Sequence, residues 1–230
     1  MPAAHPEPPA ATGVQDGLAY ALFAPAGPPL GSVVVLHGAG SQKENHFDFA
    51  RACTAAGLAA IVFDQRGHGK STGALDARAL DDVATMAALL PEGPVALRGS
   101  SRGGWVALAA ATTAGATAVV AICPASGELM RGGLRERRWS VPVDEAALDR
   151  LFATVDLRAA AAALGTGLLL QHAEDDETVP VAHSRALHAA APQSTLDVAP
   201  GGDHRSVQHD PESQARAVAF IAARCEEAAG

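Results

Sequence analysis

Apolar residues in this sequence gather in short continuous runs rather than in alternating patterns. Continuous apolarity is typical of strands that are covered on both faces, as in a parallel sheet. The pattern therefore predicts a sheet buried between two layers of helices, and residues 17–25 add one or two antiparallel edge strands before it. The runs that predict the buried strands are 32–37, 58–64, 94–99, 116–123, 167–172 and 194–199.

Ala-rich windows separate these runs and predict helices. The first predicted helix ends at Gly57, a suitable C-cap, and the last begins with Asp210 as N-cap and Pro211 at the first helical position. Alternating strands and helices predict an α/β fold with a doubly wound, mostly parallel sheet and right-handed crossovers. The predicted helical windows are 44–57, 75–91, 181–192 and 210–228.

One region breaks the alternation and separates two predicted strands by more than an ordinary crossover. It runs from residue 127 to about 158, and within it Leu148, Leu151, Phe152 and Val155 fall at helical spacing on one face. We interpret it as a small helical cap inserted over the C-terminal edge of the sheet. Residues 1–13 are predicted to be a flexible tail, and 14–230 to be one domain without internal repeats.

Composition limits the possible partners and cellular location of the protein. The formal net charge of −8 argues against a nucleic-acid or anionic-membrane partner. The three cysteines are far apart and without metal-ligand spacing, which favours reduced thiols and no metal. The N-terminus lacks the pattern of a signal peptide, and no apolar window approaches the about 20 residues that span a bilayer. We expect a cytoplasmic protein, and the Ala- and Arg-rich composition suggests a bacterial one. The sequence does not indicate an oligomeric state.

Candidate chemistry begins at the end of the run 94–99. There "GSSRGG" fits the pattern G-x-S-x-G, with Ser101 at its centre and Ser100 at a variable position. In this pattern the central residue sits on a tight strand-to-helix turn, the nucleophile elbow, that projects its side chain above the sheet. Gly99 and Gly103 remove the β-carbons that would collide with neighbouring backbone. Ser101 is therefore the candidate nucleophile.

A serine hydroxyl needs a base within hydrogen-bond reach. In this motif class the expected chain order is serine, acid, histidine. His204 follows the last predicted strand, in a glycine-rich loop at the edge where Ser101 is expected, whereas His209 is expected at the surface. The preceding strand is followed by four acidic residues, of which spacing alone leaves Asp175 and Asp176 as nearly equal candidates to orient the histidine.

The chain resembles the α/β-hydrolases of the serine esterase and lipase type, similar to the small hydrolases grouped with the S33 serine aminopeptidases and the monoglyceride lipase-like enzymes. This resemblance implies that the acid stands four residues before the Pro of a D-x-x-V-P turn, which is Asp176. A serine at the elbow excludes relatives that use Asp or Cys there. The matching segments are "VVVLHGAGSQKENHF", "IVFDQRGHGKS", "GSSRGG", "DLRAAAAALGTGLLLQHAEDDETVP" and "GGDH".

The resemblance also assigns the "LHGAG" turn as the oxyanion loop. A backbone N–H from Ala39, or from Gly40, would pair with that of Arg102, while His37 braces the loop. Gly38, Gly40 and Arg102 are the predicted substrate contacts. Relatives often carry Met or Gln where Arg102 stands, and its side chain either points over the pocket or pairs with an acidic neighbour. The turn at 63–71 is interpreted as structural. The alternative, a metal site that this turn forms together with "HAEDD", is disfavoured by ligand spacing.

The sequence thus predicts a cofactor-free serine hydrolase that cleaves small carboxylic esters through an acyl-enzyme on Ser101. The alternatives are a thioesterase, an amidase or peptidase with the same triad, and a non-catalytic binding protein on the same fold. The short cap and few aromatic residues indicate neither a long-chain lipid groove nor membrane docking. Four cap arginines are expected to form a solvated face, the alternative being a site for an anionic group: Arg131, Arg135, Arg137 and Arg138.

Overall fold

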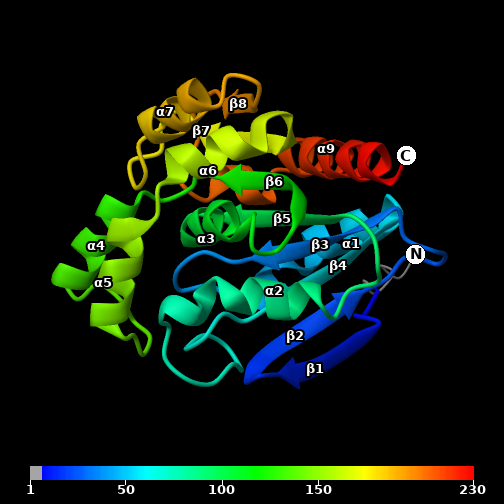
Figure 1. Ribbon diagram of the computed structural model, residues 1–230, viewed down its shortest axis with the longest axis horizontal. Coiled ribbons are helices and arrows are strands. Elements are labelled where there is room, and N and C mark those ends of the chain that lie inside the picture. Colours follow the sequence, from blue (N-terminus) through cyan, green and yellow to red (C-terminus); the bar gives the residue numbers. More distant parts are fainter. Residues whose placement is uncertain (1–6) are drawn as a thin grey trace, which may run out of the picture.

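An eight-stranded twisted sheet forms the centre of the protein (Figure 1). The computed structural model describes residues 7–230. The strand order is β1-β2-β4-β3-β5-β6-β7-β8, in which β1 and β2 are antiparallel and all later strands are parallel. The predicted doubly wound α/β sheet is confirmed. The strands are β1 Ala11–Gln15, β2 Leu18–Phe23, β3 Gly31–Leu36, β4 Leu58–Phe63, β5 Val95–Ser100, β6 Ala116–Ile122, β7 Leu168–Ala173 and β8 Thr195–Ala199.

Helices cover both faces of the sheet, which explains the continuous apolar runs. In β3, Val34 and Leu36 pack on one side and Val33 and Val35 on the other, and all four are buried. The first side is covered by α2 Asp81–Ala87, α3 Arg102–Ala110, α6 Leu157–Leu164 and α7 Ala182–Ala190. The second side is covered by α1 Phe47–Ala55 and α9 Pro211–Ala229.

Shorter helical segments complete the fold. The predicted helices 44–57 and 75–91 each divide into a 3-10 turn followed by an α-helix. At the start of α9, the Asp210 carboxylate accepts a hydrogen bond from the Ser213 amide, as expected of an N-cap. No helix within residues 7–230 is both long and apolar enough to cross a bilayer. The remaining segments are η1 Lys43–His46, η2 Ala77–Ala79, η3 Gly165–Gly167 and α8 Ser206–His209.

The predicted cap is present as two helices, α4 Gly127–Arg135 and α5 Glu145–Thr154, which project from one edge of the sheet (Figure 1). The face predicted for α5 is the one that packs inward. Phe152 meets the ring of Trp105 in α3 edge-on, with 5.1 Å between centroids, and stacks on Trp139 of the cap. The cap is therefore anchored on the helix that follows the elbow.

The start of the chain corrects the prediction of a flexible tail over residues 1–13. Strand β1 begins at Ala11, so the end of the predicted tail belongs to the sheet, and residues 1–6 lie outside the described part. Asp16 and Gly17, with φ of 51° and 80°, form a two-residue turn that pairs β1 with β2. Asp-Gly favours such hairpins because both positions require positive φ.

Candidate active site

Ser101 lies on the sharp turn between β5 and α3. Its φ of 55° and ψ of −119° are strained for a residue with a side chain. Backbone hydrogen bonds hold the strained conformation: the Ser101 amide donates to Ile122 (2.8 Å), and its carbonyl accepts from Trp105 (3.1 Å) and Ala125 (3.0 Å). Neighbouring strand and helix thus fix the direction in which the Ser101 side chain leaves the sheet.

Two glycines permit this turn. A β-carbon on Gly99 would collide with the Gly103 carbonyl, and one on Gly103 would collide with the carbonyls of Leu36 and His37. Helix α3 therefore sits directly against the backbone of β3 and β5. The sequence requirement for glycine at both positions follows from this close approach.

His204 and Asp176 form a hydrogen-bonded pair at the same edge of the sheet. His204 Nδ1 lies 2.6 Å from Asp176 Oδ2. The other oxygen, Oδ1, accepts from the amides of Thr178 (2.9 Å) and Val179 (2.8 Å). Burial tends to raise the pKa of Asp176, but the hydrogen bonds from His204 and the amides outweigh it and lower the pKa. Asp175 is exposed, so of the two candidate acids Asp176 is the one paired with His204.

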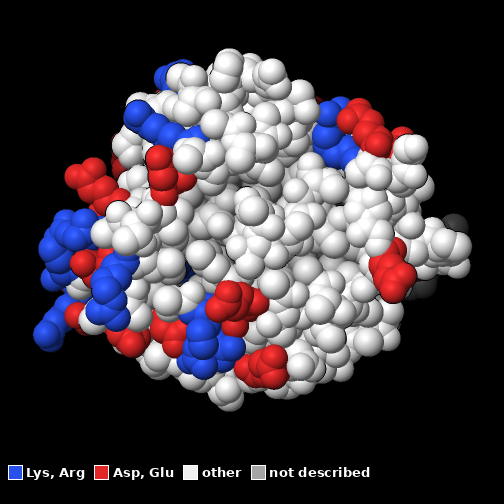
Figure 2. Space-filling model, in the orientation of Figure 1, with Lys and Arg blue, Asp and Glu red and all other residues white. Residues whose placement is uncertain are grey.

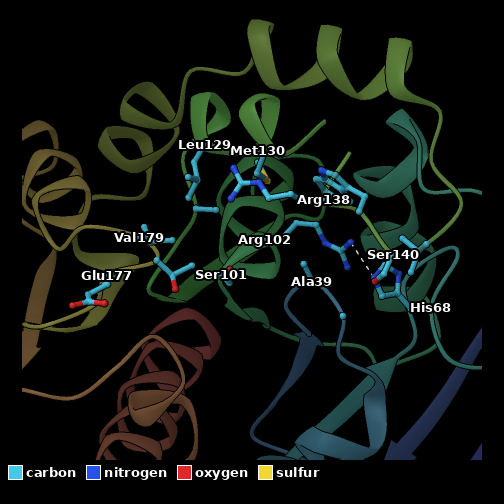
Figure 3. Close-up of a pocket in the computed structure, with 16 residues that line it drawn as sticks. Ala39, His68, Ser101, Arg102, Leu129, Met130, Arg138, Ser140, Glu177 and Val179 are labelled. Carbon is cyan, nitrogen blue, oxygen red and sulfur yellow. Dashed lines mark hydrogen bonds between the residues drawn. The ribbon is translucent and has the colours of Figure 1, made fainter. Parts of the chain in front are cut away.

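Ser101 and His204 line one cavity of about 500 Å³, together with the predicted oxyanion loop, Gly38–Gly40. Ser101 also lines a second cavity of about 630 Å³, whose far wall is the cap (Figure 3). His204 does not line the second cavity. The serine therefore sits where two differently lined spaces meet.

His37 braces the loop that the sequence predicts to be the oxyanion loop. The Gln65 amide donates to His37 Nε2 (3.0 Å), so the ring carries its proton on Nδ1, which donates to the Gly38 carbonyl (2.7 Å). Burial, with Arg102 nearby, keeps the pKa of His37 well below its usual value. Gly38 lies against Ser101, since a β-carbon there would stand 3.4 Å from Ser101 Cβ. The loop is thus held rigidly beside the candidate nucleophile.

The turn at 63–71 is tied down by ion pairs, in agreement with its structural interpretation. The Asp64 carboxylate accepts from the Lys43 amide (2.8 Å) and ammonium (2.6 Å) and from the Lys70 amide (2.9 Å). The Arg66 guanidinium pairs with buried Asp82 at 2.7 Å. Both glycines of the turn, Gly67 and Gly69, have positive φ.

Comparison with known proteins agrees with this fold. The sequence pattern of the family described as Serine aminopeptidase, S33 matches residues 27–140. The chain has the α/β-hydrolase fold. Solved structures of similar fold include a monoacylglycerol lipase of Paleococcus ferrophilus (TM-score 0.71, 21% identity, covering 90% of this chain and 99% of that one). A structure from a study of carboxylesterases of Nitrososphaera gargenis is also similar (TM-score 0.72, 15% identity, 94% and 99%). Curated protein sequences gave no match.

A third similar structure is Est1E of Butyrivibrio proteoclasticus with ferulic acid bound. Its TM-score to this chain is 0.66 at 18% identity, covering 92% of this chain and 94% of that one. At such identities the likeness concerns the fold, and the residues of the site have to be argued from this chain's own geometry.

Two buried groups near the candidate site were not predicted from the sequence. Arg98 lies inside β5, where its guanidinium covers the Phe49 ring at 4.3 Å and donates to His46 Nδ1 (3.0 Å) and the Gln208 carbonyl (2.8 Å). It thereby links the strand before Ser101 to the short helix after His204. An arginine in an otherwise apolar run was the available signal.

The second missed group is the Cys123 thiol. Its sulfur and the side-chain ligand atoms of Asp176 and His204 all lie within 4.8 Å of one another. Burial raises the pKa of Cys123 to about 12, so the sulfur stays protonated and is a poor metal ligand at neutral pH. Nothing in the spacing of the sequence places this cysteine beside the predicted acid.

The cap arginines form a charged outer face (Figure 2). Arg131 pairs with Asp149 at 2.8 Å and Arg138 with Glu136 at 2.9 Å, and all four partners are substantially exposed. Arg138 also lines the larger cavity. Arg131 therefore lies on a solvated face, as predicted for the cap arginines. Arg138, in contrast, lies at the rim of the candidate site.

Proposed function

We propose that this protein is a serine hydrolase that cleaves small carboxylic esters through an acyl-enzyme intermediate on Ser101. The observation that carries the proposal is the His204–Asp176 hydrogen bond, at 2.6 Å, opening on the same cavity as the strained Ser101. The lipase and carboxylesterases of similar fold support an ester as the substrate.

In the proposed reaction, Ser101 Oγ attacks the ester carbonyl while His204 takes the serine proton. His204 Nδ1 is bonded to Asp176, which leaves Nε2 as the nitrogen that accepts this proton. Asp176 orients the ring and stabilises its charged form. His204 then returns the proton to the leaving alcohol, and a water molecule cleaves the acyl-enzyme by the same steps in reverse.

The tetrahedral oxygen is proposed to bind between the amides of Arg102 and Ala39. Arg102 begins α3, and the first amides of a helix have no partner within it. Ala39 lies in the braced loop and lines both cavities beside Ser101. Removing one donor of this kind typically costs about 3 kcal/mol of transition-state stabilisation. Side chains, two amides and water suffice for this chemistry, so no cofactor is required.

A fluorophosphonate probe followed by mass spectrometry tests the proposal, because the probe reacts with an activated serine. We expect an adduct on Ser101 and none in Ser101→Ala, while Ser100→Ala, a change at the neighbouring serine, keeps the label. Absence of an adduct on the folded protein favours the non-catalytic alternative. p-Nitrophenyl esters of increasing acyl length, run beside a thioester and an anilide, separate esterase from thioesterase and amidase activity.

A further inference from the structure

The Arg102 side chain is a buried cation without an anionic partner. It is 2% exposed, and its Nη1 lies 3.2 Å from His68 Nε2. Its Nε and Nη2 make no hydrogen bond, and no ion pair to Arg102 occurs among the described residues. Burial lowers the pKa of Arg102 to about 9, so the guanidinium is still charged at neutral pH.

His68 does not neutralise this charge. Its Nδ1 lies 3.0 Å from the Arg66 carbonyl, to which it donates, and Nε2 is then the acceptor for Arg102. Burial and the charge of Arg102 lower the pKa of His68 to about 4, so the ring is neutral. A buried, unpaired charge carries a desolvation penalty of several kcal/mol that good packing alone does not offset. The pair therefore presents a fixed positive charge.

This charge lines the larger cavity, on the far side of Ser101 from Glu177. Figure 3 shows Arg102 directed toward His68 and Ser140, whereas Glu177 lies beyond Ser101 in the other direction. The Trp139 ring stands 5.7 Å from the guanidinium carbon. Cap residues thus cover the cation, so an anion would have to displace one of their side chains to reach Nε and Nη2.

The position of His204 decides which half of the ester meets Arg102. His204 has to protonate the departing alcohol, and it lines the smaller cavity only. The alcohol therefore leaves on that side, and the acyl half extends into the larger cavity toward Arg102. An anion on the substrate belongs on its acyl half.

Resting on the proposed function, we infer that the substrate is a half-ester of a short dicarboxylic acid. Its free carboxylate accepts from Nε and Nη2 of Arg102, a fork that matches the two oxygens of a carboxylate. Ser101 attacks the ester carbonyl at the other end and releases the alcohol with a proton from His204. Water then adds its oxygen to the acyl carbon, and the products are the dicarboxylate and the alcohol.

The kinetic test compares 4-nitrophenyl hydrogen glutarate with its neutral methyl ester. We expect the wild type to favour the carboxylate form in kcat/KM by about ten- to a hundredfold, the range for a hydrogen-bonded charge pair. Arg102→Met should reduce this ratio to near one, and Arg102→Lys should restore part of it. Arg131→Met removes a cap charge outside the cavity and should keep the full ratio.

A binding test does not depend on catalysis. Calorimetry with Ser101→Ala should detect glutarate, and adding Arg102→Met to that variant should abolish the binding. Loss of the kinetic preference in Arg138→Met but not in Arg102→Met would overturn the inference. Equal glutarate affinity with and without the Arg102→Met substitution would overturn it as well. A wild type that hydrolyses the neutral ester without preferring the carboxylate also overturns it, but leaves the esterase intact. If the protein is neither labelled by the probe nor able to hydrolyse the esters, the proposed function is wrong. Glutarate binding then still tests whether Arg102 forms an anion site.

Discussion

At the scale of single residues, Asp176 carries the most tightly specified role. Its two oxygens have different partners: Oδ2 is hydrogen-bonded to His204, and Oδ1 accepts hydrogen bonds from two amides of its own turn. The amides fix the carboxylate plane, and the plane fixes the imidazole. An asparagine keeps the two amide bonds through its oxygen, but its NH2 group donates to His204 Nδ1, which reverses the hydrogen bond to the histidine.

Asp176→Asn should lower kcat by about 10⁴-fold, because the amide stabilises the wrong tautomer of the histidine. Asp175→Asn removes an equal charge from the neighbouring, exposed position and should leave kcat close to the wild-type value. Initial rates on a p-nitrophenyl ester measure both. Equal losses in the two variants would remove Asp176 from the proposed triad.

Single residues were predictable from the sequence where a motif fixes the backbone. Ser101 follows from two glycines at set distances, and His204 from its place after the last strand. Spacing could not separate Asp175 from Asp176, because adjacent residues of a turn point in different directions that only the fold defines. The position of Arg102 in the motif could be predicted, but not the surroundings of its side chain. The guanidinium lacks an anionic partner because of side chains from the cap and from the turn at His68.

At the scale of elements, the contact between α3 and β3 sets the geometry of the elbow. The helix approaches so closely that a β-carbon on Gly103 would collide with the Leu36 and His37 carbonyls. This approach places the first amides of α3 beside the oxyanion loop. The proposed oxyanion hole therefore forms only when α3, β3 and the loop after β3 are packed together.

Gly103→Ala should destabilise the protein by about 3 kcal/mol or more, because backbone atoms cannot yield as a flexible side chain does. Gly27→Ala is a suitable control, since nothing lies within 4 Å of a β-carbon there. Urea unfolding of both variants measures the free energies. A Gly103→Ala protein as stable as the control would show that α3 can shift away from β3 at little cost.

Elements were predictable where burial is two-sided. The continuous apolar runs located all six parallel strands to within about a residue at each end, because such runs have no exposed face to interrupt them. The β1–β2 hairpin shows the limit. β1 is largely exposed and pairs through its backbone, so its side chains carry little signal, and the apolar pattern predicted edge strands over residues 17–25 only.

At the scale of the whole molecule, buried neutral histidines make the fold sensitive to acid. Burial, with Arg98 beside it, lowers the pKa of His46 to about 3, and burial with Arg102 lowers that of His68 to about 4. His37 and His172 are shifted in the same direction, again chiefly by burial. In the unfolded chain these rings take up protons near pH 6.5.

The unfolded state thus binds more protons than the native state below pH 6.5, so stability is full above that pH and is lost as the pH falls. Each such histidine removes up to about 1.4 kcal/mol per pH unit, and His46 and His68 together remove about 3 kcal/mol between pH 6.5 and 5. Denaturant unfolding at several pH values should show this decline. A free energy of unfolding that is flat over the same range would contradict it.

The cap and the strand ends come from separate segments of the chain, so substrate selectivity can change without changes to the catalytic residues. Chemistry is assigned to residues at the ends of β5, β7 and β8, while Met130, Arg138, Trp139 and Ser140 reach the cavity from one contiguous insertion. A library confined to residues 127–143 would therefore explore new acyl groups without disturbing the proton-transfer apparatus. Divergence among homologues should be concentrated in that same insertion, which makes it a natural unit of exchange between enzymes of different selectivity.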